Sequence, residues 1–177
     1  AAALFYLLHT TLLTAVFFLL ADIFHHYRPG PRDYFVTGPR SQDRILLGGL
    51  YFMAAVAFAG LPPLSGFISK FWILQSTSSP WAYALFWPIL LVSSLIIIIA
   101  LSRGGSALLW RQNKQPATTV RAPLLATGIV MTMLLGSILL SVFAQPIMMF
   151  TQSTAAQILA PERYIEAVLG GLTDANN

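Results

Sequence analysis

Gly60-Leu61-Pro62-Pro63-Leu64-Ser65-Gly66-Phe67-Ile68-Ser69-Lys70-Phe71-Trp72 is the stretch that decides the fold. Glycines and prolines interrupt an apolar run here, and a lysine follows within the same run. A helix that breaks inside a lipid bilayer frees carbonyl and amide groups, which need protein or water around them. A lysine in such a segment costs about 2.5–3.5 kcal/mol on insertion scales unless water or a partner solvates it. The two features together indicate part of an ion path rather than a plain membrane anchor.

The composition indicates a helical membrane protein. Hydrophobic residues make up 56% of the 177 residues and charged residues only 9%, against about 25% charged residues in soluble domains. The apolar residues form long runs, and these runs lack the alternation over about ten residues that is typical of barrel strands. We therefore expect an all-α fold, a polytopic transmembrane helix bundle with one discontinuous helix.

The apolar segments predict about five spans within residues 1–150. They are residues 2–24, 45–59, 64–77, 81–101 and 123–147. A straight helix from Ile45 to Thr77 would be about 50 Å long. A helix of this length is too long for one crossing of a hydrocarbon core of about 30 Å and too short for two complete crossings. The break at Gly60–Gly66 resolves this mismatch, because it divides the segment into two shorter helices. Residues 151–177 are expected to form a polar C-terminal tail with a short amphipathic helix at Pro161–Leu169, which suits a membrane interface or a partner groove.

The positive charge lies between the apolar runs. The net charge is +4, and most basic residues fall in two loops, His25–Arg44 and Ser102–Ala122. Positive charge that flanks apolar runs is typical of membrane proteins, so this pattern argues against nucleic-acid binding. Counted as five spans, the segments put the two loops on opposite faces. Each loop carries four lysine or arginine residues, so the positive-inside rule does not decide the orientation; we favour a cytoplasmic second loop.

Lys70 is the leading functional candidate. A lysine removed from bulk water can take up and release a proton near neutral pH, as a proton relay requires. The competing interpretation is that Lys70 lies near a helix end and extends its ammonium group to the lipid headgroups. It lies about two turns inside the apolar region, which favours the relay.

His9 is the second candidate, because histidine titrates near neutrality. It lies well inside the first span, and the hydroxyls of Thr10 and Thr14 beside it can hold ordered water. The alternative is a neutral histidine that bonds to a neighbouring helix and only holds the bundle together.

Several other residues are supporting candidates with a structural alternative. Asp22 either pairs with a cation or ends the first span at the interface, and Arg103 either contacts headgroups or clamps two helices. The residues of the break are expected to line a hydrated cavity, to satisfy the broken backbone, or both: Gly60, Pro62, Pro63, Ser65, Gly66 and Ser69.

Metal and cofactor chemistry find little support in the sequence. The absence of cysteine excludes disulfides and thiolate metal sites. His25 and His26 are adjacent, so they do not share a helix face, and no acid cluster lies near them. We expect no metal site and no cofactor.

The break resembles a known signature. Gly60-Leu-Pro-Pro-Leu-Ser-Gly-Phe-Ile-Ser-Lys70-Phe is similar to the motif of the antiporter-like subunits, which include the large membrane subunits of complex I and the A and D subunits of Mrp-type cation/proton antiporters. Further segments resemble the D subunit, and the resemblance runs to about Gly170. They are Phe5–Ala15 with Phe18–Asp22, Ala100–Ser106, Gln157–Pro161 and Tyr164–Gly170.

The resemblance implies a multi-pass subunit of a bacterial inner (cell) membrane and a C-terminal piece of a longer chain with two inverted repeats. Lys70 would be the lysine of the second broken helix, and His9 the histidine of the preceding proton-path helix. Many relatives carry a lysine four residues after that histidine, where this chain has Leu13. His9 then carries the relay alone, or a water chain replaces the lysine.

These implications give one expected function and two alternatives. The expected function is a subunit of a Na+/proton antiporter, a secondary transporter rather than an enzyme. Its expected partners are the other subunits of a hetero-oligomeric complex, membrane lipids, protons and monovalent cations. One alternative is a proton-pumping subunit of an NADH–quinone oxidoreductase or a membrane-bound hydrogenase. The other is a membrane scaffold that transports nothing.

Overall fold

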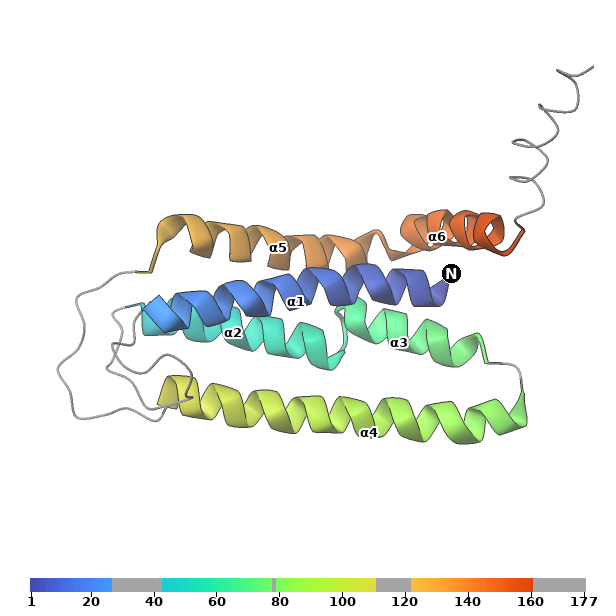
Figure 1. Cartoon of the computed structure of the whole chain (residues 1–177), viewed down its shortest axis with the longest axis horizontal. Coiled ribbons are helices and arrows are strands. Elements are labelled where there is room, and N and C mark those ends of the chain that lie inside the picture. Colours follow the sequence, from blue (N-terminus) through green and yellow to red (C-terminus); the bar gives the residue numbers. More distant parts are fainter. Residues whose placement is uncertain (27–42, 78, 111–121, 161–177) are drawn as a thin grey trace, which may run out of the picture.

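The computed structural model describes residues 1–26, 43–77, 79–110 and 122–160, and the elements in these ranges are all helical (Figure 1). The all-α prediction is therefore confirmed. The elements are α1 (Ala2–His26), α2 (Arg44–Ala59), α3 (Ser65–Gln75), α4 (Pro80–Gly105), the π-helical turn η1 (Ser106–Trp110), α5 (Leu124–Val142) and α6 (Ala144–Leu159).

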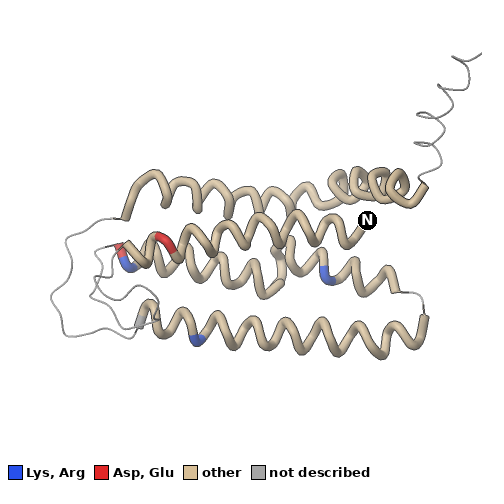
Figure 2. Tube along the Cα trace, viewed as in Figure 1, with Lys and Arg blue, Asp and Glu red and all other residues tan. Residues whose placement is uncertain are grey.

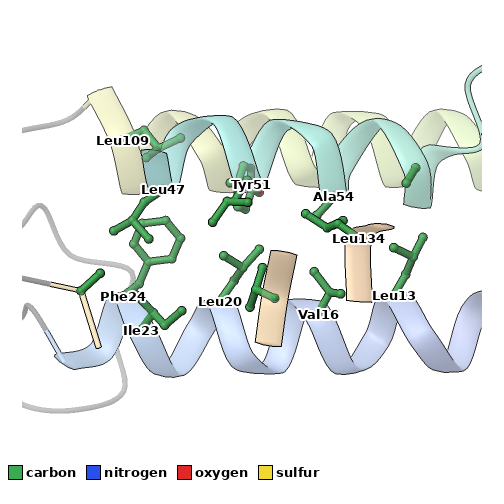
Figure 3. Packing of buried hydrophobic residues seen from close by; sticks show 14 of the residues in the cluster. Leu13, Val16, Leu20, Ile23, Phe24, Leu47, Tyr51, Ala54, Leu109 and Leu134 are labelled. Atoms are coloured by element: carbon green, nitrogen blue, oxygen red, sulfur yellow. The ribbon is translucent and has the colours of Figure 1, made fainter. Parts of the chain in front are cut away.

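Helix α1 lies in the middle of the bundle. Figure 1 shows α5 and α6 along one side of α1, α2 and α3 along the other, and α4 beyond α2 and α3. Apolar side chains of α1 recur at a spacing of three and four residues, which brings them onto one helix face. Figure 3 shows this face packed against α2: Leu13, Val16, Leu20 and Ile23, all almost fully buried. The core therefore fixes α1 beside the broken helix.

The break between α2 and α3 follows from the local sequence. Gly60 adopts a left-handed conformation with φ of 76°, which favours glycine and commonly ends a helix. Its N–H donates to Ala57 O (3.2 Å), and the Leu61 N–H donates to Val56 O (3.2 Å). Pro62 and Pro63 follow and have no N–H to continue the helix. The second half begins at Ser65, and Figure 1 shows that α3 carries on in the general direction of α2.

Three of the described helical segments are long and apolar enough to cross a membrane: Ala2–His26, Pro80–Leu109 and Leu124–Val142. The segment that begins at Pro80 runs beyond the predicted end at Leu101, because η1 continues α4. The predicted span 123–147 is divided at Phe143, where α5 ends and α6 begins.

Helix α6 passes residue 150, where the sequence predicts the end of the bundle. The division into a bundle and a polar tail remains a prediction, since the expected helix at Pro161–Leu169 lies outside the described residues.

The two basic loops connect to the same end of the bundle. Figure 1 shows the end of α1, the start of α2, the end of α4 and the start of α5 together at the left. The expectation of opposite faces was wrong because α2 and α3 together make one broken crossing rather than two.

Candidate functional site

Lys70 reaches from α3 back across the break. Its Nζ donates hydrogen bonds to Ala59 O and to Ser94 Oγ of α4, both at 2.8 Å. Ala59 O is one of the carbonyls that the end of α2 leaves free, and the negative end of a helix dipole favours a cation. The Ser94 hydroxyl donates to Leu90 O (2.6 Å), so its oxygen is available to accept from the ammonium group. Both partners of Lys70 are therefore neutral.

Lys70 is also isolated from other charges. Among the described residues the charged side chains besides Lys70 are Asp22, Asp43, Arg44 and Arg103. Figure 2 shows these gathered toward the end of the bundle where the basic loops attach, and a single basic position in α3 away from them. Lys70 is half-buried. A neutral, partly enclosed cage of this kind can hold either the ammonium or the amine form.

Gly60 makes room for the lysine side chain as well as for the turn. A Cβ added at Gly60 would lie 2.9 Å from Lys70 Nζ and 3.1 Å from its Cε and Cδ. The same residue thus ends α2 and lets the lysine chain lie against the break.

His9 is buried in α1, with 2% of its surface exposed. Its Nδ1 lies 2.8 Å from Ser65 Oγ at the start of α3, and Ser65 Oγ lies 3.1 Å from Ser137 Oγ of α5. Ser65 and Ser137 are also almost fully buried. Three helices therefore meet in one chain of polar side chains that water does not reach from outside.

Gly66 sets the approach of His9 to the break. A Cβ at Gly66 would lie 2.8 Å from His9 Nε2, 2.5 Å from Ala57 O and 3.0 Å from Gly60 Cα. Lys70 thus packs against Gly60, His9 packs against Gly66, and the two glycines touch. The structure places each of the two predicted relay residues against one glycine of the same pair.

The other residues of the break divide into two groups. Ser69 is buried, and its hydroxyl donates to Ser65 O (2.7 Å) and Gly66 O (3.1 Å), so it satisfies the backbone of its own helix. Pro62 and Pro63 are exposed. These positions shape the break, and of the predicted set Ser65 is the one hydrogen-bonded to His9 among the described residues.

The remaining candidates lie apart from this cluster. Thr10 is partly buried, whereas Thr14, Asp22 and Arg103 are exposed. Within the part of the chain that the structure describes, no hydrogen bond joins any of them to Lys70 or His9. Their predicted supporting roles remain predictions.

Two partners were missed by the sequence reasoning: Ser94, which binds Lys70, and Ser137, which binds Ser65. The available signal was a hydroxyl within a long apolar span. Such residues often bond across helices in membranes.

No group of three or more histidine, cysteine or acidic residues that could hold a metal ion occurs in residues 1–26, 43–77, 79–110 and 122–160. His25 and His26 are exposed at the end of α1.

The sequence is similar to a known family of membrane proteins and to several of its members. The family described as "NADH:quinone oxidoreductase/Mrp antiporter, TM" matches residues 1–98. The chain is 30% identical, over 96% of its length, to the D subunit of a probable K(+)/H(+) antiporter from Rhizobium meliloti. It is 29% identical to the D subunits of the Na(+)/H(+) antiporters of Bacillus subtilis and Alkalihalophilus pseudofirmus, over 94% and 96% of its length. The aligned part covers 36%, 34% and 34% of these relatives, so the chain spans about a third of their length.

Proposed function

Because the chain belongs to the family of NADH:quinone oxidoreductase/Mrp antiporter membrane subunits, we propose that it is part of a D subunit of a multisubunit monovalent cation/proton antiporter. In this proposal Lys70 and His9 carry protons through the membrane. Assembly with the other subunits couples that movement to export of sodium or a similar cation. The names of the relatives support the class, and they differ in the cation, K(+) in one and Na(+) in two.

The observation that carries the proposal is the neutral cage of Lys70. A structural lysine in a membrane is commonly paired with an acid or extended to the headgroups. Lys70 instead ends on a freed carbonyl and a serine hydroxyl, 2.8 Å from each. Because neither partner carries a charge, the lysine ammonium group is held without a fixed counter-ion. When it loses its proton, no carboxylate is left buried without its cation.

His9 fits the second position of the relay. Its Nδ1 lies 2.8 Å from Ser65 Oγ, and its Nε2 lies beside Gly66. An imidazole can accept a proton on one ring nitrogen and release a proton from the other. Leu13, one turn further along α1, is fully buried in the apolar core, so the proposal assigns the relay on this helix to His9 alone.

We further propose that the end of the bundle with the basic loops faces the cytoplasm. Eight of the ten lysine and arginine residues of the chain lie in the loops between α1 and α2 and between η1 and α5 or at the helix ends beside them: Arg28, Arg32, Arg40, Arg44 at the start of α2, Arg103 in the last turn of α4, Arg111, Lys114 and Arg121. Since both loops attach to one end (Figure 1), the positive-inside rule gives a single orientation. The protein would be a multi-pass subunit of the bacterial cell membrane.

The test is cation/proton antiport by the full-length subunit in its complex. Everted vesicles are loaded with a pH gradient, and its collapse on addition of Na+ or K+ is followed by a fluorescent amine. Lys70→Ala and His9→Ala are each expected to lower the rate by at least about tenfold, with assembly intact on native gels. The control is Thr132→Ala, which removes an exposed hydroxyl that binds only Gly128 O of its own helix (2.9 Å). Wild-type rates in both relay variants would reject the assignment.

A second candidate function follows from the family itself, whose description includes NADH:quinone oxidoreductase. A proton-pumping subunit of a redox complex would use the same local chemistry. Affinity purification of the full-length subunit separates the two, because redox subunits with flavin or iron–sulfur absorbance would co-purify only in the second case. A scaffold that transports nothing would keep the function of its complex when Lys70 is replaced by Met.

A further inference from the structure

The hydroxyl chain beyond His9 runs from α1 through α3 to α5. His9 Nδ1, Ser65 Oγ and Ser137 Oγ follow one another at 2.8 and 3.1 Å, and they belong to α1, α3 and α5. All three residues are at most 2% exposed. The bond from Ser65 to Ser137 joins two side chains and involves no backbone group of the break.

The chain can point in two directions, because each serine hydroxyl carries one proton and can accept another. When Nδ1 carries a proton, it donates to Ser65 Oγ, and the Ser65 hydroxyl donates to Ser137 Oγ. When Nδ1 is bare, the Ser137 hydroxyl donates to Ser65, and Ser65 donates to Nδ1. The direction of both hydrogen bonds therefore follows the protonation of His9.

A second buried hydroxyl lies beyond this chain on α5. Ser141 Oγ is shielded from solvent and has no hydrogen-bond partner among the described residues. It is four residues after Ser137, which places both on one face of the helix. A buried hydroxyl without a partner is unfavourable, and a water molecule commonly resolves such a deficit where two or more polar groups are within reach. Ser137 and Ser141 together offer a water molecule two hydroxyl partners.

The direction of this series is defined in the bundle. Helix α5 runs from the end with the basic loops toward the opposite end and meets α6 partway along the bundle (Figure 1). Ser141 is in the last turn of α5, so the series His9, Ser65, Ser137 and Ser141 leads toward the end opposite the basic loops.

We infer that Ser137 and Ser141 extend the proton path from His9 onto α5 and toward the membrane face opposite the basic loops. The inference rests on the proposed function, since it assumes that His9 carries protons. In one transfer a doubly protonated His9 gives its Nδ1 proton to Ser65 Oγ and becomes neutral imidazole, the Ser65 proton moves to Ser137 Oγ, and the Ser137 proton moves to a water molecule between Ser137 and Ser141. His9 loses one proton, the water gains one, and both serines remain neutral. After the transfer the two serine hydroxyls point toward His9, and both must rotate back toward Ser137 and the water molecule before the next transfer.

The experiment uses the full-length subunit in its assembled complex, in everted vesicles. The variants are Ser137→Ala, Ser141→Ala and Ser137→Thr, with Thr132→Ala as the control on the same helix. We measure the maximal antiport rate and the cation concentration that gives half of it. Ser137→Ala is expected to lower the maximal rate by about tenfold or more with the half-saturating cation concentration unchanged, because the variant removes only a hydroxyl that transfers protons. Ser137→Thr keeps the hydroxyl and should restore most of the rate.

The Ser141 variant gives an independent check and decides the matter if Ser137→Ala impairs assembly. Ser141→Ala should also lower the maximal rate, and the double variant should be little worse than Ser137→Ala alone, because the two hydroxyls act in series. A wild-type maximal rate in assembled Ser141→Ala and Ser137→Ala would overturn the inference. If His9→Ala and Lys70→Ala abolish transport in the same vesicles, the proposed function survives that result. If they do not, both fail.

Discussion

Gly66→Ala tests whether the contact between the break and His9 is as close as the structure shows. The added methyl carbon would lie 2.5 Å from Ala57 O, 2.8 Å from His9 Nε2 and 3.0 Å from Gly60 Cα. All three distances are shorter than an ordinary van der Waals contact. Two of these atoms, Ala57 O and Gly60 Cα, belong to the backbone at the end of α2 and cannot rotate away, so α3 must move relative to α2.

The expected magnitude follows from this geometry. Extra volume in a packed core typically costs about 1–3 kcal/mol, and we expect at least about 2 kcal/mol here because the contacts are to backbone. Gly128→Ala is the matched control, since nothing lies within 4 Å of a Cβ at Gly128 in α5. In a helix that exchange is expected to stabilise by about 0.5–1 kcal/mol.

The assay is a denaturant titration of the purified full-length subunit in detergent, followed by tryptophan fluorescence. Gly66→Ala should have the lower free energy of unfolding, and its antiport rate in the complex should fall with it because His9 is displaced. Equal stability of the Gly66 and Gly128 variants would refute the reasoning, since it would mean that Gly66 does not pack against the backbone at the end of α2 and against His9 as closely as these distances show.

Three further predictions concern neighbouring contacts. Ser94→Ala removes one of the two acceptors of Lys70 and should slow antiport severalfold. The control is Ser93→Ala, whose hydroxyl bonds to Leu90 O of its own helix (3.0 Å) and which should leave the antiport rate unchanged. Equal antiport rates in the two variants would argue against the role of Ser94 as a partner of Lys70. Tyr51→Phe loses the hydrogen bond to Leu101 O (2.8 Å) and should lower the free energy of unfolding by about 1 kcal/mol, measured by the same titration; an unchanged value would mean that this bond adds nothing. His25→Cys and Ser79→Cys, in a full subunit without other cysteines, should react with an impermeant maleimide from the cytoplasmic and the opposite face respectively; labelling from one face only would reject the orientation.

The sequence predicted much of the bundle because lipid imposes a simple rule. Long apolar runs must become helices, and the double proline after Gly60 must interrupt one of them. The sequence was less informative where contacts between helices determine which residues are buried and where a segment lies. The second half of α6 carries Gln152 and Ser153, and the sequence predicts a polar tail from residue 151, yet Thr151 within it is buried. The sides of the loops were misjudged because the sequence does not show that two half-helices complete one crossing.

The candidate site, like the bundle, was predictable from the sequence only in part. Lys70 and His9 stand out because titratable side chains are costly in apolar spans. Ser94 and Ser137 do not stand out, because a serine in a membrane helix commonly bonds to its own backbone, as Ser93 does. Only the packing of α4 and α5 against the break shows which hydroxyls bond to another helix.

The most direct test of the central claim is antiport by Lys70→Arg in the assembled complex. Arginine keeps a positive charge and hydrogen-bond donors at the break, but it does not release its proton in proteins. If Lys70 moves protons, Lys70→Arg should assemble normally and transport no better than Lys70→Ala. If Lys70→Arg transports at the wild-type rate, the lysine is needed only as a fixed charge, and the account of a proton relay through Lys70 is wrong.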